Sequence, residues 1–240
     1  MRSVTETDGV LLVDKAQGMT SHDVVAITRR ALNTKKVGHC GTLDPLATGL
    51  LIITVGRGTK IQDLIMSEDK EYVGTMRLGE TTDSQDADGV VVETKTVPNF
   101  SREEIEAAFE KFKGDFYQTP PMVSAIKKDG VPLYKLARQG KVVEREPRFV
   151  RVYASEIQEL RLPDVDFRVV CSKGFYVRTY AFDIGGYLGC GAHLRSLRRT
   201  KSGRFSVDGA VTVEELKTLP REEITSRILS LPEVSRLRGA

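Results

Sequence analysis

Short apolar runs alternate with amphipathic segments along the chain. Residues 9–13 predict a strand, and the apolar run 50–55, bounded by Gly49 and Gly56, predicts a buried one. Residues 71–78 alternate in the manner of a strand with two different faces. Further strands are predicted at 89–92, 149–160 and 165–171, with a short one near Phe205.

Helices are predicted where capping signals precede residues of helical periodicity. Thr20 with Asp23, and Ser101 with Glu104, have the spacing of capping boxes, and Gly114 marks the end of the second helix. Helices are also predicted at about 178–188 and 212–219, followed by a helical tail that extends to residue 240. Residues 117–148 contain four prolines and little periodicity, which indicates an excursion from the core.

These elements predict one α+β domain over residues 1–240, because they lack the regular βαβ rhythm of a doubly wound fold. We expect a large mixed, mostly antiparallel sheet flanked by helices, with the excursion at 117–148 and a helical tail at 212–240. The 40% apolar and 29% charged fractions exclude wholesale disorder.

The sequence shows no clear signal for export, for insertion into a membrane or for metal binding. The longest apolar run, 50–55, is far shorter than the roughly 18 residues that a membrane span requires, and the first residues lack an apolar signal region. The three cysteines form neither a disulfide framework nor a C-x-x-C pair. We therefore expect a cytoplasmic protein without a membrane anchor or a bound metal.

Charge is unevenly distributed along the chain, whose formal net charge is +3. Residues 81–110 hold eight acids and two bases, a balance of −6, and residues 120–151 hold eight bases and three acids, a balance of +5. Residues 191–204 hold five bases and no acid. Basic patches of this kind indicate either a polyanionic partner or ordinary solvated surfaces.

The densest set of candidate functional residues is the loop HCGTLDPLATG at residues 39–49. Asp44 precedes Pro45, which favours an extended backbone at the aspartate, and a buried strand follows. Loops held by rigid strands often carry catalytic groups. The simpler interpretation is a turn aspartate that bonds its own backbone.

Several strings of the chain closely resemble motifs of the TruB family of tRNA pseudouridine synthases, in order from about residue 9 to 212. They are DKAQGMTSHDVV, HCGTLDPLATGLL, DKEYVGTMRLGETTDSQDADG, PPMVSAIKKDGVPLYKLARQG and CSKGFYVRTYAFDIGGYLGCGAHLRSLRR. The resemblance implies the pseudouridine synthase fold and conversion of uridine 55 in the tRNA T-loop to pseudouridine, without a cofactor or metal. It also implies that residues 117–148 form a basic thumb that inserts against the T-loop.

The resemblance also implies the site residues. Asp44 matches the essential aspartate, Tyr72 the tyrosine that stacks on the target base, and Arg178 the arginine paired with the aspartate. His39 matches a histidine that supports the T-loop, and Lys15 a lysine beside the cleft. Expected contacts with RNA involve Tyr176, Lys127, Lys128, Tyr134, Lys135, Arg138, Lys141, Arg198 and Arg199.

Two of these residues also have an ordinary structural interpretation: Tyr72 as a core aromatic, and Arg178 as a surface ion pair or helix start. Separately, Asp83, Asp86 and Asp88 are interpreted as an acidic turn. The rival functions are a tRNA-folding protein with vestigial catalysis and a synthase for another structured RNA. Two departures from the family are Ala16, where proline is usual, and an end to the resemblance near residue 212. The latter predicts a catalytic domain without an appended PUA domain. We expect a monomer that acts on tRNA without a protein partner.

Overall fold

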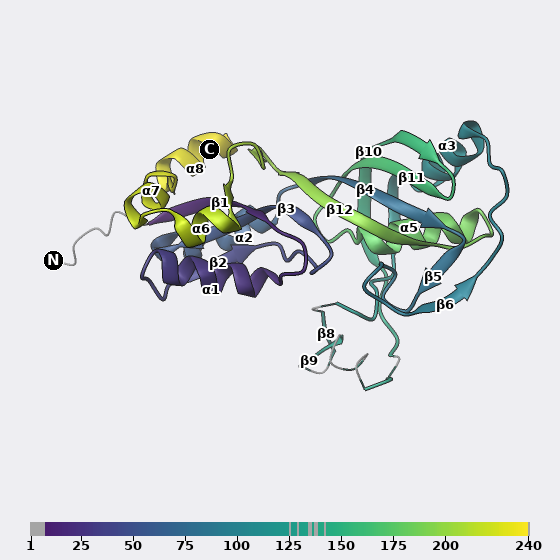
Figure 1. The fold of residues 1–240 in the computed structure, drawn as a ribbon, viewed down its shortest axis with the longest axis horizontal. Coiled ribbons are helices and arrows are strands. Elements are labelled where there is room, and N and C mark those ends of the chain that lie inside the picture. The colour runs from purple at the N-terminus through teal and green to yellow at the C-terminus, as the bar shows by residue number, and fades with distance from the viewer. Residues whose placement is uncertain are drawn as a thin grey trace. The chain divides into compact units, whose positions relative to one another are not determined.

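The computed structural model describes residues 8–124, 126–128, 130–133, 136, 139–141 and 143–239. The chain forms two compact units (Figure 1). The first comprises the described residues up to Tyr72 together with those from Leu197 onward, and the second is Val73–Ser196. Two strands, β4 (Lys70–Leu78) and β12 (Ala192–Ser202), contribute residues to both units.

The first unit is built around β1 (Gly9–Lys15) and β3 (Thr48–Val55), which pair antiparallel along their length. Every residue of β3 after Thr48 is buried, as its apolar run predicted. Strand β12 pairs parallel with the start of β3, so the sheet is mixed. The strands that complete it are β2 (Val37–Cys40), β13 (Phe205–Ser206), β14 (Val211–Thr212) and β15 (Leu229–Ser230).

Helix α1 (Ser21–Ala31) begins at the predicted capping box of Thr20 and Asp23. The core of this unit joins Val10, Leu50 and Ile52 of the sheet to Ile65 and Val234 of two helices. The other helices of the unit are the 3₁₀-helix η1 (Gly56–Ile61), α2 (Gln62–Met66), α6 (Val213–Thr218), α7 (Arg221–Ser226) and α8 (Leu231–Arg238). The predicted helical tail is therefore three short helices with β15 between the last two.

The second unit contains the long antiparallel pair β10 (Arg148–Arg161) and β11 (Asp164–Cys171) and the short strand β7 (Gly114–Gln118). Its strand order is β12-β4-β11-β10-β7. Helices α3 (Arg102–Lys111) and α5 (Val177–Tyr187) pack on this sheet through Phe109, Phe167 and Tyr180, whose ring centroids are 5.7–6.2 Å apart. Shorter strands of this unit are β5 (Glu80–Thr82) and β6 (Val91–Thr94). Figure 1 shows β5 and β6 as a two-stranded ribbon.

The excursion leaves the sheet between β7 and β10, which pair at Gln118 and Arg148. Its described residues include a two-stranded ribbon, β8 (Lys127–Lys128) and β9 (Val131–Pro132). Most of the basic segment 191–204, for which the sequence predicted no strand, is the eleven-residue strand β12. In the described part of the chain, no helix combines the length and apolar character needed to span a membrane.

Candidate active site

Asp44 lies in the loop that joins β2 to β3 in the first unit, and it is half-buried. Its backbone carbonyl accepts a hydrogen bond from the Ala47 amide at 3.0 Å, which closes a turn. Leu43, Leu46 and Ala47 are buried around it, so apolar side chains anchor the loop on both sides of the aspartate. A carboxylate is therefore presented from a loop with little freedom to move.

Lys15 holds this loop from within the unit. Its side chain is fully buried, and its ammonium donates hydrogen bonds to the carbonyls of Ala47 at 2.6 Å, Ala16 at 2.9 Å and Pro45 at 3.4 Å. The Gly18 amide adds a bond to the Pro45 carbonyl at 2.9 Å. A buried ammonium is stable only when its N–H groups are hydrogen-bonded. The three carbonyls supply these bonds, and in return the lysine holds the backbone of the loop in place. Lys15 has no exposed surface and supports the loop from within, and its expected place beside the cleft stays a prediction.

Ser21 is a second support of the loop, and the sequence did not reveal it. Its hydroxyl is buried; it accepts from the Leu43 amide at 2.9 Å and donates to the Leu43 carbonyl at 3.1 Å. Both backbone groups of the residue before Asp44 are thus bound to the first residue of α1. The only signal in the sequence was the neighbouring capping box, which places Ser21 at a helix start but does not reveal its partner.

His39 lies on β2, with its ring edge-to-face against His22 at a centroid distance of 5.2 Å. Burial, with the positive charges of His22 and Arg199 nearby, lowers the pKa of His39 to about 4. The imidazole is therefore neutral near pH 7, which suits hydrogen bonding and stacking better than pairing with a phosphate. Its predicted contact with the T-loop stays a prediction.

This pKa predicts a pH dependence of stability. An unfolded histidine takes up a proton near pH 6.5, whereas folded His39 stays neutral down to about pH 4. Its contribution to the free energy of unfolding is therefore complete above pH 6.5 and is lost as the pH falls toward 4. We expect a loss on the order of 1–2 kcal/mol after solvent screening, measured by urea unfolding at pH 7.5 and 4.5. His39→Gln should remove that part of the pH dependence; an unchanged profile would contradict it.

Tyr72 is the last residue of the first unit, on β4, and it is 8% exposed. This burial is consistent with the interpretation of Tyr72 as a core aromatic. It is equally consistent with an aromatic ring that stacks on a base only after the base has entered the site. Its predicted stacking role stays a prediction.

Arg178 is a buried residue of α5 in the second unit, 3% exposed. Its guanidinium donates to the carbonyls of Ser84 at 2.8 Å and Val123 at 2.7 Å, and its Nε lies 3.5 Å from an oxygen of Asp86. The structural alternative of a surface ion pair is therefore wrong. Asp44 belongs to the other unit, so the implied pairing of Arg178 with Asp44 stays a prediction.

Asp86, within the predicted acidic turn, is a further residue whose importance the sequence did not reveal. It is 5% exposed and accepts hydrogen bonds from the Ser84 hydroxyl and the Asp88 amide. A buried carboxylate needs a positive partner, and Arg178 supplies one. The string DSQDADG alone did not indicate which of its aspartates would be buried.

Tyr176 precedes α5 and is joined to β7 by the side chain of Gln118. The Tyr176 amide donates to Oε1 of Gln118 at 2.8 Å, and Nε2 of Gln118 donates to the Tyr176 carbonyl at 3.1 Å. Gln118 is 2% exposed and is the last residue of β7, where the chain leaves the sheet. This contact ties the start of α5, two residues from Arg178, to the base of the excursion.

The two arginines of β12 that were expected to bind RNA differ in environment. Arg198 forms a two-bond fork with Asp14, at 2.9 and 2.7 Å, and its side chain is 39% exposed. Its phosphate contact stays a prediction. Arg199 is 1% exposed and donates to the carbonyls of Leu50 and Gly41. Its guanidinium is thus buried and bound to backbone carbonyls, and its expected contact with RNA stays a prediction.

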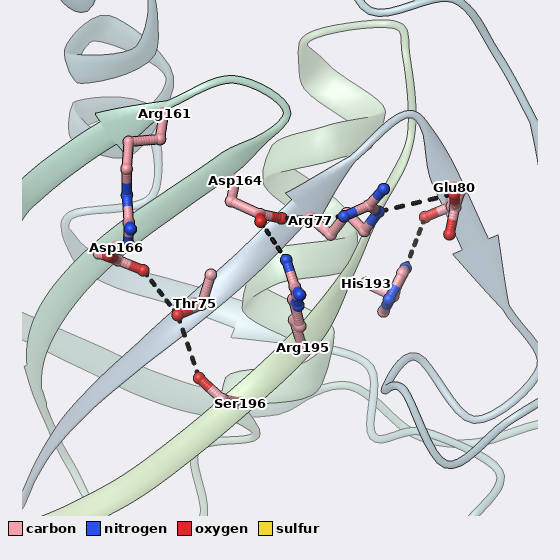
Figure 2. A network of polar contacts seen from close by, with 9 residues as sticks. All are labelled: Thr75, Arg77, Glu80, Arg161, Asp164, Asp166, His193, Arg195 and Ser196. Atoms are coloured by element: carbon pink, nitrogen blue, oxygen red, sulfur yellow. Dashed lines mark hydrogen bonds and ion pairs between the residues drawn. The ribbon is translucent and has the colours of Figure 1, made fainter.

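Other basic residues near this strand are engaged in ion pairs on the second unit. Figure 2 shows Arg195 paired with Asp164, which also lies 3.5 Å from Arg77. Beside it, the Ser196 hydroxyl donates to Thr75 at 3.1 Å, and Thr75 donates to Asp166 at 2.6 Å (Figure 2). These contacts link the side chains of β12, β4 and β11, so part of the basic segment stabilises the sheet.

The thumb residues are only partly described. Lys141 is exposed, and Lys127 and Lys128 form β8, although their side chains lie outside the described part of the structure. Tyr134, Lys135 and Arg138 lie outside the described residues. Within the described ranges, no three histidine, cysteine, aspartate or glutamate side chains gather in a way that could hold a metal ion.

Comparison with known sequences agrees with this arrangement. Residues 29–177 match the model of the TruB family pseudouridylate synthase N-terminal domain, and residues 178–231 that of the tRNA pseudouridylate synthase B C-terminal domain. A tRNA pseudouridine synthase B from Opitutus terrae is 58% identical over 224 residues, 93% of each chain. Another from Syntrophotalea carbinolica is 47% identical over 229 residues, 95% of this chain and 75% of the relative.

Solved structures support the predicted pseudouridine synthase fold. A Cbf5–Nop10–Gar1 complex matches with a TM-score of 0.73 and 30% identity, over 97% of this chain and 63% of that one. An H/ACA RNP bound to a substrate RNA containing 2′-deoxyuridine matches with a TM-score of 0.72 and 28% identity, over 96% and 62%. This chain thus spans less than two thirds of those two chains. The family match also continues to residue 231, beyond the predicted limit near 212. The chain belongs to the TruB family of pseudouridylate synthases, which isomerise uridine in tRNA.

Proposed function

We propose that the chain isomerises uridine 55 in the T-loop of tRNA, with Asp44 as its catalytic carboxylate. The observation that carries the proposal is the loop of Asp44, whose flanking backbone is bound by the buried side chains of Lys15 and Ser21. A loop fixed in this way suits a reaction in which one carboxylate must meet a small target atom.

The reaction breaks the bond between C1′ of the ribose and N1 of the uracil, turns the base, and forms a bond from C1′ to C5. The hydrogen on C5 leaves as a proton, and N1 gains one, so no oxidant or reductant is needed. An ionised Asp44 serves either as a nucleophile, at C1′ or at the base, or as the base that removes a ribose proton in an elimination. The target uridine must leave the stack before any of these steps.

Tyr72 and Arg178 complete the proposed catalytic set. Tyr72 supplies an aromatic face for the extruded base, and its hydroxyl is a group that can exchange a proton with the uracil. Arg178 keeps a facing carboxylate ionised and oriented, and its guanidinium is itself held rigidly by two backbone carbonyls. The proposal includes action as a monomer in the cytoplasm, without a protein partner.

Tritium release from tRNA labelled at uracil C5 tests the proposal. Isomerisation must expel this hydrogen, so one equivalent should be released from wild-type tRNA and none from tRNA in which uridine 55 is replaced by cytidine. Binding without release would favour the alternative of a tRNA-folding protein with vestigial catalysis. Release from another structured RNA, but not from tRNA, would favour the other alternative.

Neutralising the thumb is expected to weaken binding but not chemistry. If residues 117–148 hold the T-loop, Lys127→Gln, Lys128→Gln and Lys141→Gln together should weaken tRNA affinity. Each lost phosphate contact should reduce the slope of log K against log salt by roughly 0.7–0.9. The single-turnover rate at saturating tRNA should persist.

A matched control neutralises three exposed lysines elsewhere in the second unit: Lys95, Lys111 and Lys113. These lie on or near the acidic segment 81–110, so the slope should stay unchanged. An equal change of slope in both triple variants would show that the effect is one of net charge and not of the thumb.

A further inference from the structure

Arg199 is the largest fully buried side chain among the described residues, and nothing in the proposed chemistry uses it directly. Its guanidinium remains charged at any ordinary pH, so burying it is costly unless its N–H groups are bound. Nε donates to the carbonyl of Leu50 at 2.7 Å, and Nη2 donates to the carbonyl of Gly41 at 3.0 Å. Both acceptors are backbone groups of the first unit.

These two carbonyls lie at opposite ends of the loop that carries Asp44. Gly41 is the first residue after β2, and Leu50 is the third residue of β3. One guanidinium therefore links the start of the loop, at Gly41, to its end, at Leu50. The backbone of β12 adds to this tie, since Arg198 pairs with Thr48 and Arg199 with Gly49 in a parallel register.

The two glycines of the loop are fitted closely to Arg199. Gly49 has a φ of +94°, and a Cβ placed there would lie 2.3 Å from the Arg199 carbonyl oxygen. Gly41 has a φ of +76°, and a Cβ placed there would lie 3.3 Å from Nη1 of Arg199. Both positions favour glycine for conformational reasons, and both face the same arginine.

We propose that Arg199 is a positioning residue for Asp44. It holds the two ends of the catalytic loop together, while Lys15 and Ser21 bind backbone groups between those ends. The inference rests on the proposed catalytic role of Asp44. Arg199 reaches the two carbonyls from two separate nitrogens, Nε and Nη2, held in one rigid plane, whereas the N–H groups of a lysine all leave one nitrogen at the end of a flexible stem. A shift of about 1 Å in a catalytic group is enough to lower a rate about 100-fold.

Arg199→Lys provides the main test. We expect the single-turnover rate at saturating tRNA to fall about 10- to 100-fold, with an unchanged Kd and an unchanged salt slope. Hydrogen exchange of the amides in residues 41–49 should become faster. Arg238→Lys is the matched control, since Arg238 also lies in the first unit and donates to Glu68 and to the Leu64 carbonyl. It should leave both the rate and exchange in the loop unchanged.

Gly41→Ala is the second variant, because it disturbs the same contact without altering a buried charge and so covers the case in which Arg199→Lys fails to fold. It should lower the rate about tenfold with unchanged Kd. An unchanged rate and unchanged loop exchange in Arg199→Lys would overturn the inference, as would a lower affinity with a smaller salt slope. Unchanged rate and exchange in a folded Gly41→Ala would overturn it equally. If the wild type releases no tritium but Arg199→Lys still shows faster exchange in residues 41–49, the structural role of Arg199 in holding the loop would be supported. The proposed function would then be rejected.

Discussion

Asp44→Asn is expected to abolish pseudouridine formation while leaving tRNA affinity nearly unchanged. The amide has the shape of the carboxylate but carries no charge, so it serves neither as a nucleophile nor as a base. Removing the central group of a catalytic set lowers rates by roughly four orders of magnitude or more. The backbone contacts that hold the loop involve Lys15, Ser21 and carbonyls and do not require the Asp44 charge.

Tritium release under single-turnover conditions and filter binding of the same labelled tRNA measure the two quantities separately. Asp63→Asn is the matched control, since Asp63 is exposed on α2 of the same unit. It makes the same change of charge and should retain the wild-type rate. Substantial turnover by Asp44→Asn would refute the catalytic assignment, and a parallel collapse of affinity would indicate that Asp44 is structural.

Arg178→Lys is expected to lower the single-turnover rate about 100- to 1,000-fold, equivalent to about 3–4 kcal/mol of transition-state stabilisation. Arginine reaches the carbonyls of Ser84 and Val123 and lies beside Asp86 at the same time. A lysine keeps the charge, but its N–H groups all leave one nitrogen, so it does not reproduce the geometry in which three separate nitrogens of Arg178 meet the three groups. Affinity for tRNA should change little, because the side chain is buried.

Arg151→Lys provides the comparison for Arg178→Lys. Arg151 forms a two-nitrogen contact with Asp115 in the same unit, but its side chain is 49% exposed. The same substitution there should leave the rate unchanged and should have little effect on stability, because an exposed ion pair is screened by solvent. If both variants match the wild type in rate, Arg178 has no role in the active site.

Local signals were most reliable where a few neighbouring residues decide the structure. The capping boxes at Thr20 and Ser101 start helices where predicted, because the hydrogen bonds involved lie within one turn of the chain. The apolar run ending at Val55 forms the buried strand β3 for a similar reason. Strand β12 was missed, because its arginines hide the apolar alternation and its pairing partners are distant in the chain.

The sequence by itself determined the family, the kind of reaction and the candidate residue Asp44, because motifs are contiguous strings whose chemistry depends on residue type. Only the tertiary structure decided which charged side chains are buried. Lys15, Arg199 and Asp86 are of types that usually face solvent. The sequence placed Lys15 beside the cleft, Arg199 among the contacts with RNA, and Asp86 in an acidic turn. Each is buried against backbone groups or an opposite charge. The physical reason is that a polar group enters the interior only where partners satisfy it, and those partners come from distant segments of the chain.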